Sequence, residues 1–172
     1  RELAKDLGTS VMPVREAIRR LEEAGLAEKS PYKGAVVKGL SRDDLLQIYE
    51  VRLTLEAQAA GAGAARITQR DLARMRHHHE QMLTALEERR VADVLDHDEQ
   101  LLSVLFAAAG NEVLLELIRT LWRRCRPYKI VGARETLEHG ETTVLSQYQQ
   151  QLIDAAAEHD SQAAVTVSDA SI

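Results

Sequence analysis

The sequence predicts a mostly α-helical protein in two parts, and three observations lead to this fold class. Apolar residues recur at spacings of three and four along most of the chain, which is typical of amphipathic helices. Two short β-prone runs flank a single turn signal at Ser30-Pro31, and no longer β pattern follows. With 172 residues, 45% of them hydrophobic, the chain can form two small cores.

The stretch GTSVMPVREAIRRLEEAGL, residues 8–26, predicts a capped helix with a basic outer side. The Ser10 hydroxyl can accept a hydrogen bond from an amide of the first turn, where Pro13 is also tolerated. Gly25 suits the end of the helix. We expect an apolar stripe of Val14, Ala17, Ile18, Leu21 and Leu26 to face a core, with Arg15, Arg19 and Arg20 outside.

A short helix in RELAKDLG precedes this stretch, and we expect Leu3, Ala4 and Leu7 to face inward. Helix, glycine turn and basic helix is the layout of a helix-turn-helix, whose second helix lies in the DNA major groove. The hairpin that follows would complete a winged helix with lysines beside a duplex backbone. An ordinary helical hairpin is the alternative interpretation.

The charge distribution supports two modules, 1–40 and 41–172. Residues 1–40 carry eight Lys/Arg against six Asp/Glu, a net charge of +2, whereas the remainder carries a net charge of −7. The basic charge therefore gathers in the segment that is predicted to bind DNA.

Residues 41–172 predict an all-α helical bundle. Ser41 with Asp44, and Thr68 with Asp71, have the spacing of a capping box, which marks a helix start. The stretch IVGARETLEHGET, residues 130–142, is predicted to be the one irregular loop. The expected helices are 43–65, 68–88, 91–109, 111–128, 142–158 and 160–172.

Polar residues interrupt the apolar rows of these helices. Asp98 stands in the row Val91, Leu95, Leu102 and Leu105, and Gln149 and Ser171 interrupt two further rows. A buried carboxylate is costly unless it is paired or coordinated. Two interpretations remain open: Arg52 pairs with Glu56 while the others bond to backbone, or these side chains converge on a small cavity.

Three segments resemble a known family. RELAKDLGTSVMPVREAIRRLEEAGLAEKSPYKGAVV resembles the GntR superfamily of bacterial transcription regulators, chiefly through P-V-R-E-A. LLQIYEVRLTLEAQAA and LFAAAGNEVLLELI resemble the ligand domain of its FadR branch, the FCD domain. The resemblance implies a homodimeric repressor that binds double-stranded operator DNA under control of a small-molecule metabolite. It also implies that a first helix precedes Arg1, so that the chain is a fragment.

The resemblance implies a set of DNA contacts. Positions that match the family's contacts to phosphates and groove edges are Arg1, Ser10, Arg15, Lys33 and Gly34. Val11 and Met12 stand where the family commonly has Arg-Thr, so they would offer apolar contacts of the kind made to thymine methyl groups.

Many members of this family hold a divalent metal through one aspartate and three histidines. Asp98 matches the aspartate, but Leu102, Gln149 and Ser171 stand at the histidine positions. This set is poor for zinc and similar ions, so we expect no metal and no cofactor. The expected effector site is Arg52, Asp98, Gln149 and Ser171, with Arg52 as the anchor for a small polar metabolite of mixed hydroxyl and acidic or amino character.

Other function classes find little support. The three consecutive histidines at 77–79 point about 100° apart on a helix, so they cannot share one metal, and all six histidines are expected at the surface. No nucleophile elbow or phosphate loop indicates an enzyme, and no run is long enough to cross a membrane. The single Cys125 suggests a reducing, cytoplasmic location. The alternatives are a helical metal-dependent enzyme or binding bundle, and a regulator whose second domain only dimerises.

Overall fold

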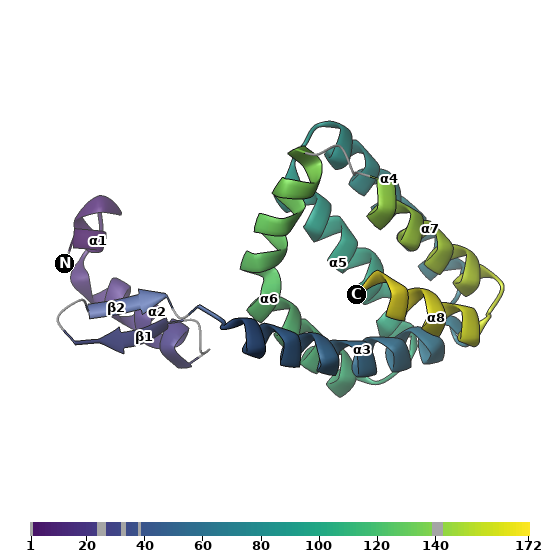
Figure 1. Ribbon diagram of the computed structural model, residues 1–172, viewed down its shortest axis with the longest axis horizontal. Helices are drawn as coiled ribbons and strands as arrows, with labels where there is room; N and C mark the ends of the chain where they lie inside the picture. Colours follow the sequence, from purple (N-terminus) through teal and green to yellow (C-terminus); the bar gives the residue numbers. More distant parts are fainter. Residues whose placement is uncertain (1, 24–26, 32–33, 38, 139–142) are drawn as a thin grey trace. The chain divides into compact units, whose positions relative to one another are not determined.

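The computed structural model describes residues 2–23, 27–31, 34–37, 39–138 and 143–172. In this part of the chain, eight α-helices and one two-stranded sheet are formed, which confirms the mostly α fold class (Figure 1). The chain divides into two compact units, Arg1–Asp44 and Leu45–Ile172. None of the helices in the described residues combines the length and apolar composition needed to cross a bilayer.

The first unit has the predicted helix-turn-helix followed by a hairpin. Its glycine turn at Gly8 has φ +61°, a left-handed conformation that glycine adopts without strain. The two strands are antiparallel, with Ala27 opposite Val37 and Ser30 opposite Gly34. The elements are α1 Glu2–Asp6, α2 Val11–Glu23, β1 Ala27–Ser30 and β2 Gly34–Val37.

The predicted apolar stripe of the first unit is only partly buried. Ala4 and Val14 are buried and Ile18 is half-buried. The inward placement predicted for Leu3, Leu7, Ala17 and Leu21 is wrong, because these side chains are exposed. The described part of this unit has one helix of five residues, one of thirteen and a short hairpin, which is too little surface to cover both sides of α2. Leu26 and Gly25 lie outside the described residues.

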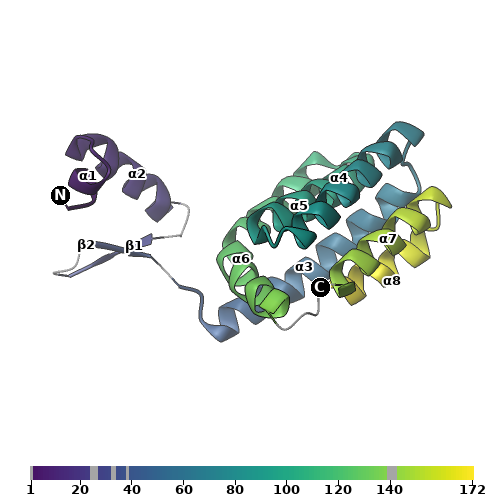
Figure 2. The same ribbon diagram turned by 90° about the horizontal axis from the view of Figure 1, so that it is seen from above.

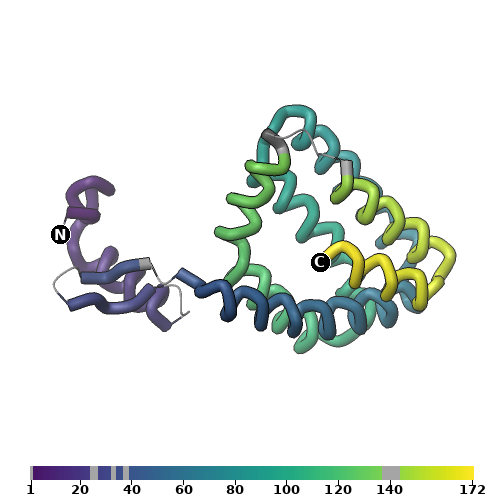
Figure 3. The backbone as a smooth tube through the Cα atoms, in the orientation of Figure 1, coloured from purple at the N-terminus to yellow at the C-terminus, as the bar shows by residue number. Residues whose placement is uncertain are grey.

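The second unit is the predicted all-α bundle, and Figure 3 traces it from α3 to α8. Helix α4 packs against α5 and α7, α6 packs against α5, and α8 packs against α7 (Figure 2). In Figure 1 the last residues of α8 point toward the middle of the group of helices. The helices are α3 Arg42–Ala64, α4 Gln69–Glu87, α5 Val91–Ala108, α6 Glu112–Glu138, α7 Thr143–Ala157 and α8 Ser161–Ser171.

Both predicted capping boxes are present. The Asp44 amide donates to Ser41 Oγ at 3.1 Å, and the Ser41 amide donates to Asp44 Oδ2 at 3.1 Å. Thr68 and Asp71 form the same reciprocal pair at the start of α4. The hydrogen bond from the Thr68 hydroxyl lowers the pKa of Asp71 below its usual value. These bonds satisfy first-turn amides, so they fix where α3 and α4 begin.

The core of the second unit is formed by residues of α3, α4, α5, α6, α7 and α8. Gly63 is needed for close packing, because a Cβ at this position would collide with the Leu105 carbonyl oxygen. Helix α3 can therefore approach the backbone of α5. The largest fully buried apolar side chains are Phe106, Leu72, Met75, Met82, Leu101, Leu105, Ile118, Leu152 and Ile153.

The irregular loop predicted for residues 130–142 is wrong over its described part, because α6 continues through Pro127 to Glu138. Proline removes one backbone donor and normally ends or bends a helix, but α6 passes through Pro127 without ending there. The continuation places Lys129, Ala133 and Thr136 at helical spacing against one cavity. Residues 139–142 lie outside the described part.

The histidines are not all at the surface as expected. His79 is buried, and its Nε2 lies 3.1 Å from the Ser146 carbonyl oxygen. His78 is half-buried on α4, with its ring centroid 5.9 Å from that of His97 on α5. His77 is exposed, and His159 Nδ1 lies 2.9 Å from the Ala64 carbonyl oxygen. His139 lies outside the described residues.

The environment of His78 predicts a loss of stability in mild acid. Burial is the main cause that lowers the pKa of His78 from 6.5, followed by the nearby His97 and His77. The unfolded chain therefore binds more protons than the folded chain as the pH falls below about 6.5, so the free energy of unfolding decreases there.

We expect His78→Asn to show a smaller fall in melting temperature than the wild type when the pH is lowered from about 7.5 to about 5.5. Its control is His77→Asn at the neighbouring exposed position, which should keep most of the wild-type pH dependence. Equal pH dependence in His78→Asn and the wild type would contradict this role of burial.

Candidate functional site

Four residues predicted from the sequence line one small cavity of about 80 Å³ in the second unit. Arg52 comes from α3, Asp98 from α5, Gln149 from α7 and Ser171 from α8. Helix α6 adds Lys129 to the same lining. Side chains from five helices therefore meet at one point, although the four predicted positions are up to 119 residues apart in the chain.

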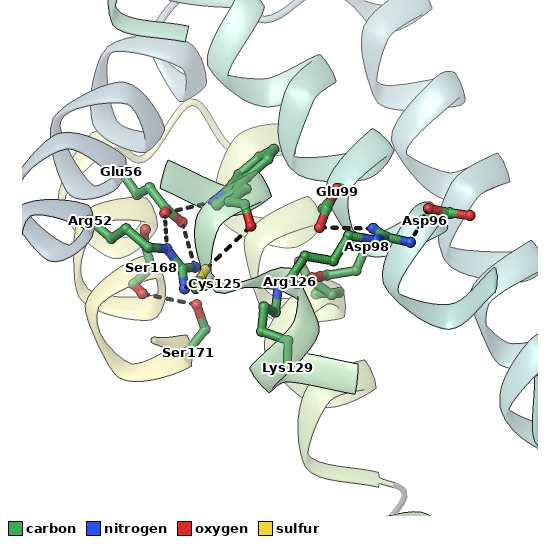
Figure 4. Close-up of polar contacts among 12 residues, drawn as sticks. Arg52, Glu56, Asp96, Asp98, Glu99, Cys125, Arg126, Lys129, Ser168 and Ser171 are labelled. Atoms are coloured by element: carbon green, nitrogen blue, oxygen red, sulfur yellow. Dashed lines mark hydrogen bonds and ion pairs between the residues drawn. The ribbon is translucent and has the colours of Figure 1, made fainter. Parts of the chain in front are cut away.

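Arg52 is held by a buried ion pair. Its Nε donates to Glu56 Oε1 at 2.7 Å and its Nη2 to Glu56 Oε2 at 3.4 Å, and the two residues are only 4% and 1% exposed. Trp122 Nε1 also donates to Glu56 Oε1, at 2.8 Å. Figure 4 shows Arg52 between Glu56 and Cys125. Burial opposes the charged form, but the hydrogen bond and charge of Glu56 raise the pKa of Arg52 above its usual value.

Asp98 is the second buried carboxylate of the cavity. Lys129 Nζ lies 3.4 Å from Asp98 Oδ2, and the side-chain amide of Gln149 donates to Asp98 Oδ1. Gln149 is 1% exposed, and within the described residues its Oε1 has no hydrogen-bond partner. Both residues line the cavity, and the unpartnered Gln149 oxygen is an acceptor that a bound donor could satisfy.

A larger apolar cavity of about 290 Å³ shares four lining residues with the small one. These shared residues are Leu95, Lys129, Leu145 and Ser171. Sequence reasoning missed both this cavity and Lys129, because it ended the helix at residue 128. The spacing of Lys129, Ala133 and Thr136 is the signal that could have found them. The remaining lining residues are Leu86, Val91, Val94, Ala133, Thr136, Val144 and Tyr148.

The side chains of the small cavity do not fit the divalent metal that many members of the resembled family bind. Leu102 offers no donor atom, and Gln149 directs its amide nitrogen toward Asp98. The Lys129 ammonium lies where it would repel a cation beside Asp98. In the described residues, no group of three or more His, Cys, Asp or Glu could hold a metal ion. Transition metals would need more imidazole, thiolate or carboxylate ligands than this.

This donor set predicts that the purified protein contains no stoichiometric zinc, nickel or manganese. Treatment with a chelator should leave the melting temperature unchanged, because no buried metal would then contribute to folding. Elemental analysis and thermal unfolding before and after chelation measure both expectations. About one ion per chain, lost in Asp98→Asn, would contradict the assignment.

In the first unit, several predicted DNA-binding residues lie around the start of α2. Ser10 directly precedes the helix, Val11 is half-buried, and Met12 is 71% exposed. Arg15 is exposed and makes no ion pair with any residue in the described ranges, whereas Arg19 pairs with Glu16 and Glu23. Gly34 begins β2 with φ +78°. Arg1 and Lys33 lie outside the described residues.

The two units match two family models. Residues 47–172 match the FCD domain, and residues 1–37 match the bacterial regulatory proteins of the gntR family. The chain is 27% identical over 146 residues to the HTH-type transcriptional regulator McbR of Escherichia coli K12, covering 82% of this chain and 66% of that protein.

A second relative is 37% identical over 117 residues, covering 64% of this chain and 66% of its own length. It is an uncharacterized HTH-type transcriptional regulator from the TAR-I ttuE-ttuC′ intergenic region of Agrobacterium vitis. The solved structure of E. coli McbR/YncC has the same fold, with a TM-score of 0.81 and 24% identity, covering 96% of this chain and 78% of that chain.

The aligned region spans slightly less than two thirds of either relative's sequence. Both relatives are named as transcriptional regulators and not as enzymes, in agreement with the sequence analysis. The match to the FCD domain covers well over half of the chain. The chain therefore belongs to the FCD-domain group of the gntR family of bacterial regulatory proteins.

Proposed function

We propose that this chain belongs to a cytoplasmic transcriptional repressor whose affinity for operator DNA is controlled by a small metabolite. Residues 1–40 would bind double-stranded DNA, and residues 41–172 would bind the metabolite and form a homodimer. The observation that carries the effector proposal is the cavity lined by Arg52, Asp98, Gln149 and Ser171. Four helices contribute these polar side chains to one place, as ligand sites in helical bundles require.

The DNA-binding proposal rests on the exposed start of α2. Arg15 has no competing ion pair in the described part of the chain, and Met12 presents an apolar side chain to solvent. A recognition helix contacts base edges through residues near its N-terminus. Ser10, Val11 and Gly34 lie at or near the turns of this unit, and Arg1 and Lys33 complete the proposed set.

The effector can change operator affinity only if it binds two conformations of the dimer unequally. One recognition helix covers a few base pairs, so a dimer that places two of them on two half-sites gains both affinity and specificity. A ligand that favours one separation of the two recognition helices would therefore strengthen or weaken DNA binding. The remaining candidate function is that of a regulator in which residues 41–172 only form the dimer and bind no effector.

The test is to extract small molecules from the purified full-length protein and identify them by mass spectrometry. The extract is then added to the protein on a labelled operator duplex, selected from random sequences, while fluorescence anisotropy reports the affinity. We expect the extract to change operator affinity in the wild type. The dimerisation-only function would be favoured if the extracted molecule does not change DNA binding. It would also be favoured if the protein retains no small molecule and responds to none.

A matched pair of variants connects this response to the cavities. Leu145 lines both cavities, so Leu145→Trp should fill them and abolish the response while operator affinity is kept. Gln147 is an exposed residue of the same helix, and Gln147→Trp should respond like the wild type. An unchanged response in Leu145→Trp would contradict the cavity assignment.

A further inference from the structure

We propose that the effector is an α-amino acid with an apolar side chain, held through its ammonium group by Asp98 and Gln149 and through its carboxylate by Lys129. This inference rests on the proposed function and names the class of ligand. It differs from the expectation drawn from the sequence, in which Arg52 anchors a polar metabolite. The difference arises from the charges, the acceptor atoms and the neighbouring apolar cavity.

The charges around the small cavity are already balanced. Arg52 pairs with Glu56, and Lys129 pairs with Asp98, so four charged side chains form two ion pairs. A simple carboxylate would bring one more negative charge into a site where charges are poorly solvated, which is costly. A zwitterion brings one charge of each sign, so the cavity stays neutral when it binds.

The acceptor atoms select an ammonium group. Asp98 and the side-chain oxygen of Gln149 both accept hydrogen bonds, and the Gln149 oxygen is buried and has no partner within the described ranges. An ammonium group carries three donors, which can satisfy both residues at once. A ligand with only acceptor atoms would leave the Gln149 oxygen unsatisfied, at a cost in binding affinity.

The carboxylate of the ligand is assigned to Lys129. The ammonium of Lys129 has three donors, and its one described polar contact is with Asp98. Lys129 lines both cavities, so a head group held there leaves the rest of the ligand facing the larger one. Arg52 is less available to a ligand, because two of its nitrogen atoms already donate hydrogen bonds to Glu56. Figure 4 shows Lys129 and Arg52 as separate groups on α6 and α3.

The larger cavity selects an apolar side chain of limited size. Its lining is mostly aliphatic and includes Leu86, Val94, Leu95 and Leu145. Its volume of about 290 Å³ lies near the lower end of the range for small-molecule sites. An apolar side chain that enters it leaves water and gains contacts, whereas a second carboxylate there would find no cation in the lining other than Lys129.

The test measures binding to the full-length protein by isothermal titration calorimetry. The probes are L-valine, L-leucine, L-methionine and L-phenylalanine, together with the amide and the deaminated acid of whichever binds most tightly. We expect at least one amino acid to bind, and loss of either charged group to weaken binding about tenfold or more. The proposal is wrong if none of the four binds, or if the deaminated acid binds as tightly as the amino acid.

Two variants should change the relative affinities for the amino acid, its amide and the deaminated acid, each in a different way. In Asp98→Asn the ligand's ammonium group loses its counter-charge, and Lys129 loses the carboxylate with which it pairs. Lys129 is then free to pair with a ligand carboxylate, so the deaminated acid should bind more tightly than it does to the wild type. In Lys129→Met the amino acid and its amide should bind equally. Arg126→Met is the control, since Arg126 pairs with Asp96 and Glu99 and lines neither cavity. Unchanged preferences in both variants would overturn the assignment even if both variants fold normally.

Failure of this inference can be distinguished from failure of the proposed function. If no apolar amino acid binds but the copurified metabolite still changes operator affinity, the ligand class is wrong and the effector function stands. If an amino acid binds with the expected preferences but operator affinity does not change, the site is correct and the control of DNA binding is wrong.

Discussion

Replacing Arg15 with alanine in the full-length protein is expected to nearly abolish operator binding at moderate salt. Arg15 lies on the exposed side of α2, one turn after the helix begins, and has no ion pair within the described part of the chain. A good arginine contact is worth about 1–3 kcal/mol, and a homodimer loses two of them, so affinity should fall about 30-fold or more. Fluorescence anisotropy with the selected operator duplex measures this loss.

Arg19 provides the matched control on the same helix. It pairs with Glu16 and Glu23, so Arg19→Ala removes an arginine whose charge is already compensated. We expect operator affinity to change by less than about fivefold, or about 1 kcal/mol, because the Arg19 guanidinium already pairs with two carboxylates. Unchanged affinity in Arg15→Ala would contradict the assignment of α2 as the recognition helix. A large loss in Arg19→Ala would instead indicate that the contact extends further along α2.

The parts of the fold that local chemistry determines could be predicted from the sequence. The capping boxes at Ser41 and Thr68 and the turn at Gly8 depend on neighbouring residues, and each is present as expected. The burial of Leu3 and Leu7 could not be judged in this way, because helical spacing shows which residues share a face but not whether anything covers it.

The site was predictable where a polar residue interrupts an apolar row. Asp98 and Gln149 were found because a buried carboxylate or amide needs a partner, and each proves to be the other's partner. Lys129 was missed because the predicted helix ended at residue 128, whereas α6 continues through Pro127 and Gly132, two residue types that commonly end helices, to Glu138. The sequence also left open whether Arg52 pairs with Glu56. Trp122, which holds Glu56 in place, is 66 residues away in the chain.

The buried Arg52–Glu56 pair predicts a large loss of stability when one partner is removed. Glu56→Gln keeps the shape of the side chain and an oxygen for the Trp122 indole, but it leaves the buried guanidinium of Arg52 without a counter-charge. Removing one partner of a buried ion pair costs about 3–5 kcal/mol. We therefore expect a loss of this size in the free energy of unfolding, measured by urea denaturation.

Two further variants identify the cause of that loss. Asp93 pairs with Arg90 at the surface of the same unit, so Asp93→Asn should cost less than about 1 kcal/mol. The double variant Arg52→Met with Glu56→Leu should be more stable than Glu56→Gln, because it removes both buried charges together. If Glu56→Gln costs no more than Asp93→Asn, the pair is solvated in solution and Arg52 is available to a ligand, which would restore it as the anchor of the effector.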